Sequence, residues 1–190
     1  MNADIVPPEI VELAQAGQSY VERALDVEID FQPETLAMLD HYAASVRADV
    51  VLKPELGAVL GPALGAYFGE VLRVRLRGFW RIPSANQQDW SVCSRVVFLA
   101  INPIGVGYDA IYGSSDHDGP RSTLRVAPED TKFLDQRLAV IPEVPEDEFY
   151  SFTTRFETLE VALEALSEKM HDEGYGGTEY SADDYGLDYG

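Results

Sequence analysis

The N-terminal part of the chain alternates apolar and polar residues with the period of an α-helix. Apolar positions recur three and four residues apart between residues 8 and 25, and again between residues 33 and 46. Pro8 and Pro33 open these stretches, which fits the first turn of a helix, where a missing N–H costs nothing. We therefore expect helices from Pro8 to about Leu25 and from Pro33 to about Val46. The segment "DVEIDFQ" is predicted to be a connector or short strand, and "ADVVLKP" to separate the second helix from the next.

Glycine recurs at every fourth residue of the segment "LGAVLGPALGAYFGEVLRVRLRGFW". The four positions are Gly57, Gly61, Gly65 and Gly69. Such a row lets a second helix approach closely, with a crossing angle near −50°. Each glycine costs about 0.8–1 kcal/mol of helix propensity relative to alanine, which close packing must recover. Pro62 predicts a break or kink, with Gly61 at the boundary of a second helical segment that runs to about Leu76.

The middle of the chain has the composition of β-strands. The runs "GFWRIP", "WSVCSRVVFLAI" and "STLRVA" are rich in β-branched and aromatic residues and are bounded by Gly, Pro, Asn and Ser. They predict strands near residues 78–82, 90–101 and 122–126, with "SANQQD" as a hairpin loop. Pro103 and Pro128 each open a short predicted helix, the first ending near Tyr112. Asn102 is placed to cap that first helix.

From Pro145 the pattern again becomes helical, with apolar residues in alternating steps of three and four. The positions are Phe149, Phe152, Phe156, Leu159, Leu163, Leu166 and Met170. Within one domain such a seam packs on a sheet or on other helices more often than on a second chain, so a monomer is favoured over a dimer formed through it. The strands cluster between helices without β-α-β alternation. We therefore expect an α+β fold over residues 1–170, with N-terminal helices, a small and mostly antiparallel central sheet, and a long C-terminal helix across it.

The composition changes at residue 171. The segment "HDEGYGGTEYSADDYGLDYG" holds six acidic residues, no lysine or arginine, and four tyrosines. Because it is poor in aliphatic residues and rich in glycine, it is predicted to be a flexible tail over residues 171–190. The tyrosines, which we consider as anchors for a partner protein or for the chain's own arginines, are Tyr175, Tyr180, Tyr185 and Tyr189. A purely solubilising tail is the alternative.

Charge narrows the classes of partner. The chain has 33 acidic and 14 basic residues and a net charge of −19, which argues against general nucleic-acid binding. The acidity favours a basic protein partner, cations or solubility alone. The longest uncharged apolar run, Leu56 to Gly69, has 14 residues, whereas a membrane helix needs about 20. With no signal-peptide pattern at the N-terminus and Cys93 as the single cysteine, we expect a cytoplasmic protein without membrane contact.

Most catalytic and metal-binding patterns are missing from the sequence. No nucleophile elbow, zinc-protease, CxxC or phosphate-loop motif is present, and we expect no cofactor or metal. Cys93 lies in a strand-like run, where a buried and inert thiol is expected. The loop "SSDHDG" offers Asp116, His117 and Asp118, but its spacing departs from that of a calcium loop. A solvated turn is the favoured interpretation of this loop.

The best functional lead is a cluster of charges after the glycine row. Glu70 follows an otherwise apolar stretch, and three arginines, Arg73, Arg77 and Arg81, lie within eleven residues of it. Cations at a helix C-terminus complement the helix dipole, which accounts for Arg73 and its neighbour Arg75. The dipole accounts less well for Arg77 and Arg81. An anion-binding patch is the alternative, with a partner's acidic segment, a phosphorylated molecule or the chain's own tail as ligand.

Several phrases together resemble an uncharacterised family of small bacterial domains. They are "ALDVEIDFQPETLAMLDHY", "GAYFGEVLRVRLRGFW", "AINPIG" and "EFYSFTTRFETL", which combine a G-x-Y-x-G-E-V helix, a Trp-bearing strand and an N-P-I-G turn. The resemblance covers about Tyr20 to Leu166 and leaves out the tail. It implies a compact α+β domain and implies no activity.

We carry three hypotheses for function. The first is a non-enzymatic cytoplasmic interaction module, such as an adaptor, an immunity-like inhibitor or an assembly component. It rests on the acidity, on the tail and on the missing catalytic patterns. The second is an enzyme with an acid–arginine site at Glu70, Arg73 and Arg77. The third is a sensor domain that binds a small anion at the same arginines.

Overall fold

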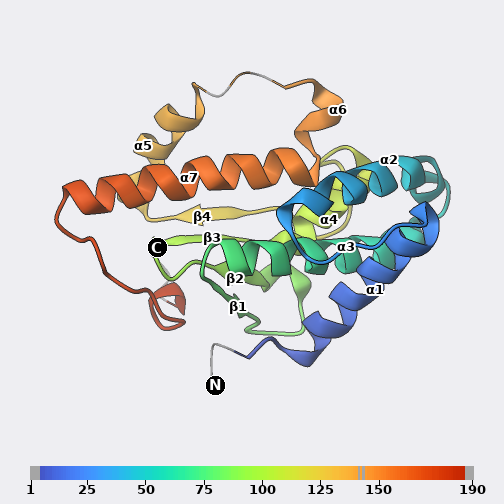
Figure 1. The fold of residues 1–190 in the computed structure, drawn as a ribbon, viewed down its shortest axis with the longest axis horizontal. Helices are drawn as coiled ribbons and strands as arrows, with labels where there is room; N and C mark the ends of the chain where they lie inside the picture. Colours follow the sequence, from blue (N-terminus) through green and yellow to red (C-terminus); the bar gives the residue numbers. More distant parts are fainter. Residues whose placement is uncertain (1–4, 141, 143, 187–190) are drawn as a thin grey trace.

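The computed structural model describes residues 5–140, 142 and 144–186. The α-helices are α1 (Pro8–Leu25), α2 (Leu36–Leu52), α3 (Pro54–Arg75), α4 (Pro103–Tyr112), α5 (Pro128–Leu138), α6 (Glu146–Phe149) and α7 (Phe152–Asp172). The strands are β1 (Phe79–Arg81), β2 (Ser91–Cys93), β3 (Leu99–Ile101) and β4 (Leu124–Val126), and short 3-10 turns lie at Pro33–Thr35, Gln87–Asp89 and Asp184–Gly186. The fold is α+β, as the sequence predicts. Figure 1 shows α7 lying across the molecule, with α5 and α6 on one side of it and the sheet on the other.

The sheet is antiparallel throughout, in the order β1-β2-β3-β4. Each strand pairs with its neighbour in sequence, with Trp80 opposite Val92 and Ala100 opposite Arg125. The predicted strand 90–101 is in fact two strands. The chain turns between them at residues 94–98, where the Ser94 N–H donates to the Leu99 carbonyl at 2.9 Å. The turn contains neither glycine nor proline, so nothing in the local sequence marks it.

The two faces of the sheet contact different parts of the chain. Trp80, Val92 and Ile101 belong to the main hydrophobic core, which they share with the helices. Because side chains alternate along a strand, the neighbouring residues point the other way, to what we call the outer face. Its members include Phe79, Arg81, Ser91, Cys93, Ala100 and Arg125.

Helix α3 lies at the centre of the helical layer and contacts α4 almost backbone to backbone. A Cβ atom built on Gly65 would lie 2.6 Å from the Ile104 Cα, and one on Gly107 would lie 2.2 Å from the Gly61 carbonyl oxygen. Helix α1 makes a similar approach, since a Cβ on Gly17 would lie 2.4 Å from the Ala63 carbonyl oxygen. The glycine row is therefore a packing surface, as predicted.

The predicted break at Pro62 is wrong. Helix α3 is continuous from Pro54 to Arg75, with Pro62 buried inside it. Proline deprives the helix of one N–H donor, but the packing of α1 and α4 against this part of α3 compensates for that loss. Gly61 is likewise no boundary, because its α-carbon lies against the ring of Tyr108.

Two other helix limits differ from the prediction. Helix α2 begins at Leu36, after a 3-10 turn that Pro33 opens, and continues to Leu52, so that only Lys53 separates it from α3. The helix expected from Pro145 is divided into α6 and α7. Ser151 divides them because its side-chain oxygen caps α7, accepting the Thr154 N–H at 3.1 Å.

Asp40 in α2 provides a second cap for α7. Its Oδ1 accepts the Phe152 N–H at 2.6 Å, and its Oδ2 accepts the Thr153 N–H at 3.1 Å. A carboxylate at this position satisfies free N–H groups and complements the helix dipole. The apolar seam of α7 then packs inside the chain, with Phe152, Phe156 and Leu159 in the main core.

Candidate functional site

The Glu70 carboxylate is hydrogen-bonded to two neighbouring side chains, those of Arg73 and Trp80. The Arg73 guanidinium donates Nε to Oε1 at 3.0 Å and Nη2 to Oε2 at 3.0 Å, and the Trp80 indole donates Nε1 to Oε1 at 2.7 Å. The Glu70 side chain is 16% exposed. Both carboxylate oxygens are thus engaged in fixing β1 to the end of α3, through charge-assisted hydrogen bonds.

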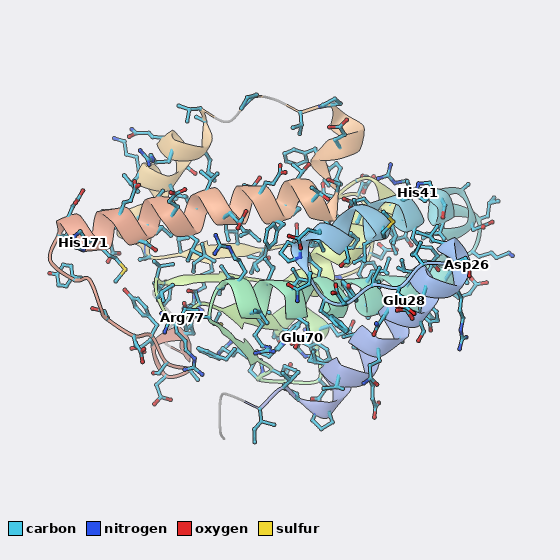
Figure 2. All side chains as sticks on the ribbon, in the orientation of Figure 1. Asp26, Glu28, His41, Glu70, Arg77 and His171 are labelled. Atoms are coloured by element: carbon cyan, nitrogen blue, oxygen red, sulfur yellow. The ribbon has the colours of Figure 1, made fainter. Side chains whose placement is uncertain are left out.

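The other arginines of the predicted cluster diverge from this pair. Arg75 pairs with Glu160 of α7, with 2.5 Å between its Nε and Oε1. Arg77 is exposed just beyond the end of α3, and Arg81 lies on β1. Figure 2 shows Arg77 well apart from Glu70. Within the predicted acid–arginine cluster, the structure therefore places Glu70 and Arg73 in contact.

Arg77 ends α3 in a left-handed conformation, with φ of 48°. The Gly78 N–H donates to the Arg73 carbonyl at 2.7 Å, and the Arg77 N–H to the Val74 carbonyl at 3.2 Å. These bonds are those of a Schellman motif, whose left-handed residue is usually glycine. A residue with a Cβ atom is strained there by about 1–2 kcal/mol.

We expect Arg77→Gly to stabilise the protein by about 0.5–1 kcal/mol, because the strain relieved exceeds the extra chain entropy that glycine gives the unfolded state. Urea unfolding followed by tryptophan fluorescence measures the change. Arg77→Ala is the matched control, since it removes the guanidinium but keeps the Cβ atom. Equal free energies of unfolding for the two variants would contradict the backbone explanation.

The C-terminal segment folds back onto the outer face of the sheet. We call residues 180–186 the plug. Tyr185 is 1% exposed and belongs to a second, smaller hydrophobic core with Phe79, Cys93, Phe98 and Ala100. Its ring stacks on Phe98, with 4.6 Å between centroids, and meets Phe79 edge-on at 5.9 Å. Figure 1 shows the segment descending from α7 to this side of the sheet.

The hydroxyl of Tyr185 reaches the backbone of the β2–β3 turn. It accepts the Leu99 N–H at 3.0 Å, and the carbonyl oxygens of Ser94 and Val97 lie 2.7 and 3.0 Å away. Burial raises the pKa of this phenol well above its usual range. Tyr185 therefore acts as a neutral donor and acceptor that closes the end of the hairpin.

Arginines surround the plug on the outer face. The Arg125 Nη1 donates to the Tyr185 carbonyl at 3.0 Å, and the Tyr180 N–H donates to the Arg95 carbonyl at 2.8 Å. The guanidinium of Arg95 lies over the Phe79 ring at 4.8 Å from its centroid, a cation–π contact. The plug is thus held by aromatic burial and by arginines other than the predicted ones.

The segment predicted to be a flexible tail therefore includes a buried residue, Tyr185, and Tyr180 also packs against this second core. Although the segment has few aliphatic residues, Tyr185 docks on the apolar outer face that the sheet already provides. The flexibility of residues 171–190 stays a prediction. Tyr175 is 62% exposed, and Tyr189 lies outside the described residues.

Cys93 lies beneath the plug. It is fully buried, as expected, and burial raises the pKa of its thiol to about 11. Nucleophilic chemistry requires the thiolate, which such a pKa suppresses near neutral pH. The thiol is therefore an inert core group for as long as the plug covers it.

A buried polar cluster lies elsewhere, between α4, α7 and the loop after α4. Asp109 is 1% exposed and accepts from Ser122 Oγ at 2.5 Å, while its carboxylate lies 2.9 Å from His117 Nε2 and 3.5 Å from Arg155 Nη2. The prediction of a solvated turn is thus wrong for His117, although Asp116 beside it is exposed. Within the described ranges no group of three or more His, Cys, Asp or Glu residues could hold a metal ion.

Sequence reasoning missed Asp109 as the centre of that cluster. The sequence did hold a signal, because Asp109 is the single charged residue in the helix Pro103–Tyr112. Apart from two tyrosines, the rest of that helix is apolar, and nearly all of it is buried. A charge in such a helix must have partners, because an unpaired buried carboxylate is too costly. The cluster joins three segments and leaves the carboxylate fully occupied.

No family model, curated protein or solved structure matches this chain. The resemblance to a family of small bacterial domains therefore stays a prediction. In the part of the chain that the structure describes, no helix combines the length and the apolar character needed to cross a membrane.

Proposed function

We propose that this chain is a non-enzymatic protein-interaction module, and that its binding surface is the outer face of the sheet, covered in this structure by its own plug. The carrying observation is the burial of Tyr185 in an arginine-bordered aromatic site formed by residues far from it in sequence. An adaptor, an inhibitor or an assembly component would use such a surface. The free thiol of Cys93 and the acidity make the cytoplasm the expected compartment.

The way the plug is attached supports its displacement. Residues 173–179, which connect it to α7, are all exposed. Gly174 and Gly177 have φ values of 83° and 94°, and no atom outside their immediate neighbours lies near their α-carbons. A connecting segment with few contacts opens at low free-energy cost. Low cost is required of any segment that a competing partner is to displace. Release of the plug would separate the Tyr180 hydroxyl from the Met170 Sδ of α7, which lies 4.0 Å away.

The chemistry of the plug indicates the partner. Its anchor is a tyrosine, its charged residues are acidic, and the residues around it include Arg95 and Arg125. A partner segment that replaces it would carry an aromatic anchor, which reproduces the stacking, and a backbone carbonyl for Arg125. Acidic residues beside the anchor would suit the positive charges of Arg95 and Arg125. The surface itself thus favours an acidic segment over the basic partner that net charge alone suggested.

Removing the anchor tests the proposal on the full chain. Tyr185→Ala eliminates burial that contributes about 3 kcal/mol or more to plug docking. We therefore expect Cys93 to react with a disulfide reagent about a hundredfold faster at pH 8. Tyr175→Ala is the matched control, since that tyrosine is exposed in the same segment, and its rate should equal that of the unmodified chain. Equal rates for both variants would contradict a plug held by Tyr185.

A peptide of residues 179–186 then tests whether the surface binds a segment in trans. It should bind saturably to the Tyr185→Ala chain and slow the Cys93 reaction again, while the unmodified chain and Tyr175→Ala should not bind it. A peptide with alanine in place of the Tyr185 side chain should fail. If the peptide binds all three proteins equally, the surface is not closed by the plug. A cellular partner should be captured by the Tyr185→Ala chain and released by the same peptide.

A further inference from the structure

The outer face of the sheet is hollow beside the plug. The middle strands contribute small side chains there, Ser91 from β2 and Ala100 from β3, whereas the edge strands contribute Arg81 and Arg125. Small residues between long ones leave a cavity of about 130 Å³. Its lining includes Arg81, Asp89, Ser91, Asn102, Thr123, Arg125 and Tyr185.

The charges of this cavity differ from those of the protein as a whole. Two arginines and one acid, Asp89, line it, in a chain of net charge −19. The Asp89 Oδ2 accepts from the Ser84 hydroxyl at 2.8 Å, which ties it to the β1–β2 connection. Arg81 is half-buried, and its side chain has no hydrogen bond or ion pair to any residue that the structure describes. A positive hollow in an acidic protein selects an anion.

Other groups of the lining also suit an anion. Ser91 and Thr123 carry hydroxyl groups, which can donate. The Asn102 amide is already committed, because its Nδ2 donates to the carbonyls of Gln87 and Gln88 at 2.9 and 3.1 Å and its Oδ1 accepts the Gly105 N–H at 3.0 Å. Asn102 therefore forms a fixed wall of the cavity. Arg125 is also engaged, since its Nη1 donates to the Tyr185 carbonyl, and the Ser91 Oγ lies 3.5 Å from the Cys93 Sγ. Recognition of an anion thus rests mainly on Arg81 and the Thr123 hydroxyl.

We propose that this cavity is a binding site for one small oxyanion of about the size of phosphate. Guanidinium groups bind planar and tetrahedral oxyanions through paired N–H donors. The volume is well below the roughly 300–1,000 Å³ of pockets for drug-sized ligands, so a nucleotide is too large. The site rests on Arg81 and its neighbours, and the docked plug completes it, because Tyr185 is one of the lining residues.

Titration with inorganic phosphate tests the site. At constant ionic strength held with chloride, calorimetry of the full chain should show saturable binding with one phosphate per chain, and the melting temperature should rise with it. Arg81→Gln should weaken binding at least about tenfold, because it removes charged hydrogen bonds. Arg77→Gln is the matched control and should bind as tightly as the unmodified chain, since Arg77 is exposed outside the cavity.

Three results would overturn the site: equal effects of phosphate and chloride, equal losses in Arg81→Gln and Arg77→Gln, or a stoichiometry above one. Arg81→Lys provides a second variant that retains the charge. It should bind phosphate more weakly than the unmodified chain and more tightly than Arg81→Gln, because a lysine offers a point charge without the paired donors. Full affinity in Arg81→Lys would show that charge alone, without the geometry of the cavity, holds the anion.

Discussion

Replacement of Gly65 by leucine is expected to lower the free energy of unfolding by about 3 kcal/mol or more. A Cβ atom there would lie 2.6 Å from both the Ile104 Cα and the Pro103 carbonyl oxygen. These are backbone atoms of α4 and cannot rotate aside, so the two helices must separate or shift. Urea unfolding followed by the fluorescence of Trp80 and Trp90 measures the loss.

Gly186→Ala is the control for that experiment, because nothing lies within 4 Å of a Cβ atom at this glycine. It should change stability by less than about 0.5 kcal/mol. Gly107→Ala disrupts the same contact between α3 and α4 from the α4 side, since its Cβ would lie 2.7 Å from the Gly65 nitrogen. The two substitutions should therefore be non-additive when combined. A loss below about 1 kcal/mol for Gly65→Leu would mean that α3 and α4 are not in close contact.

Asp109→Ala is expected to destabilise the protein by about 3–5 kcal/mol. The substitution leaves the Arg155 guanidinium without the carboxylate beside it, and it removes the partner of His117 and Ser122. Breaking a buried charge pair from one side carries this cost because the remaining charge stays desolvated. Burial already lowers the pKa of Arg155, which shows how poorly its surroundings solvate it.

Asp116→Ala is the matched control, an exposed aspartate seven residues further along the chain, and it should be close to neutral. The double variant Asp109→Ala with Arg155→Met should recover part of the lost stability, because it removes the stranded charge together with its partner. Thermal unfolding of the unmodified chain, Asp109→Ala, Arg155→Met, the double variant and Asp116→Ala provides the comparison. If the double variant loses the sum of the two single losses, Asp109 and Arg155 do not act as a pair.

The fold class was accessible from the sequence because each element has a strong local pattern. Pro8, Pro103 and Pro128 begin helices as proline at a first turn predicts, and Asn102 caps α4 as expected. The helix ends that the sequence did not predict correctly depend on contacts with residues far away in the chain. Pro62 remains helical because neighbouring helices pack around it, which a local propensity cannot express.

The candidate site was harder to predict, for a related reason. Glu70 and its arginines are adjacent in sequence, and adjacency alone suggested a common site. The residues that the structure does assemble, Arg81, Arg125 and Tyr185, come from two edge strands and the C-terminal segment. Their proximity depends on the strand order and on the return of the chain after α7. Neither of these is encoded in a short stretch of residues.

The position of the plug in the chain also governs how the protein is made. The sheet is complete at Val126, whereas Tyr185 is synthesised only after α5, α6 and α7. During translation the aromatic outer face is therefore exposed while these helices emerge from the ribosome. Exposed apolar surface of this kind makes a nascent chain a target for chaperones and prone to aggregation. A product that ends before residue 180 would lack Tyr185, and its outer face would stay uncovered until another segment bound there.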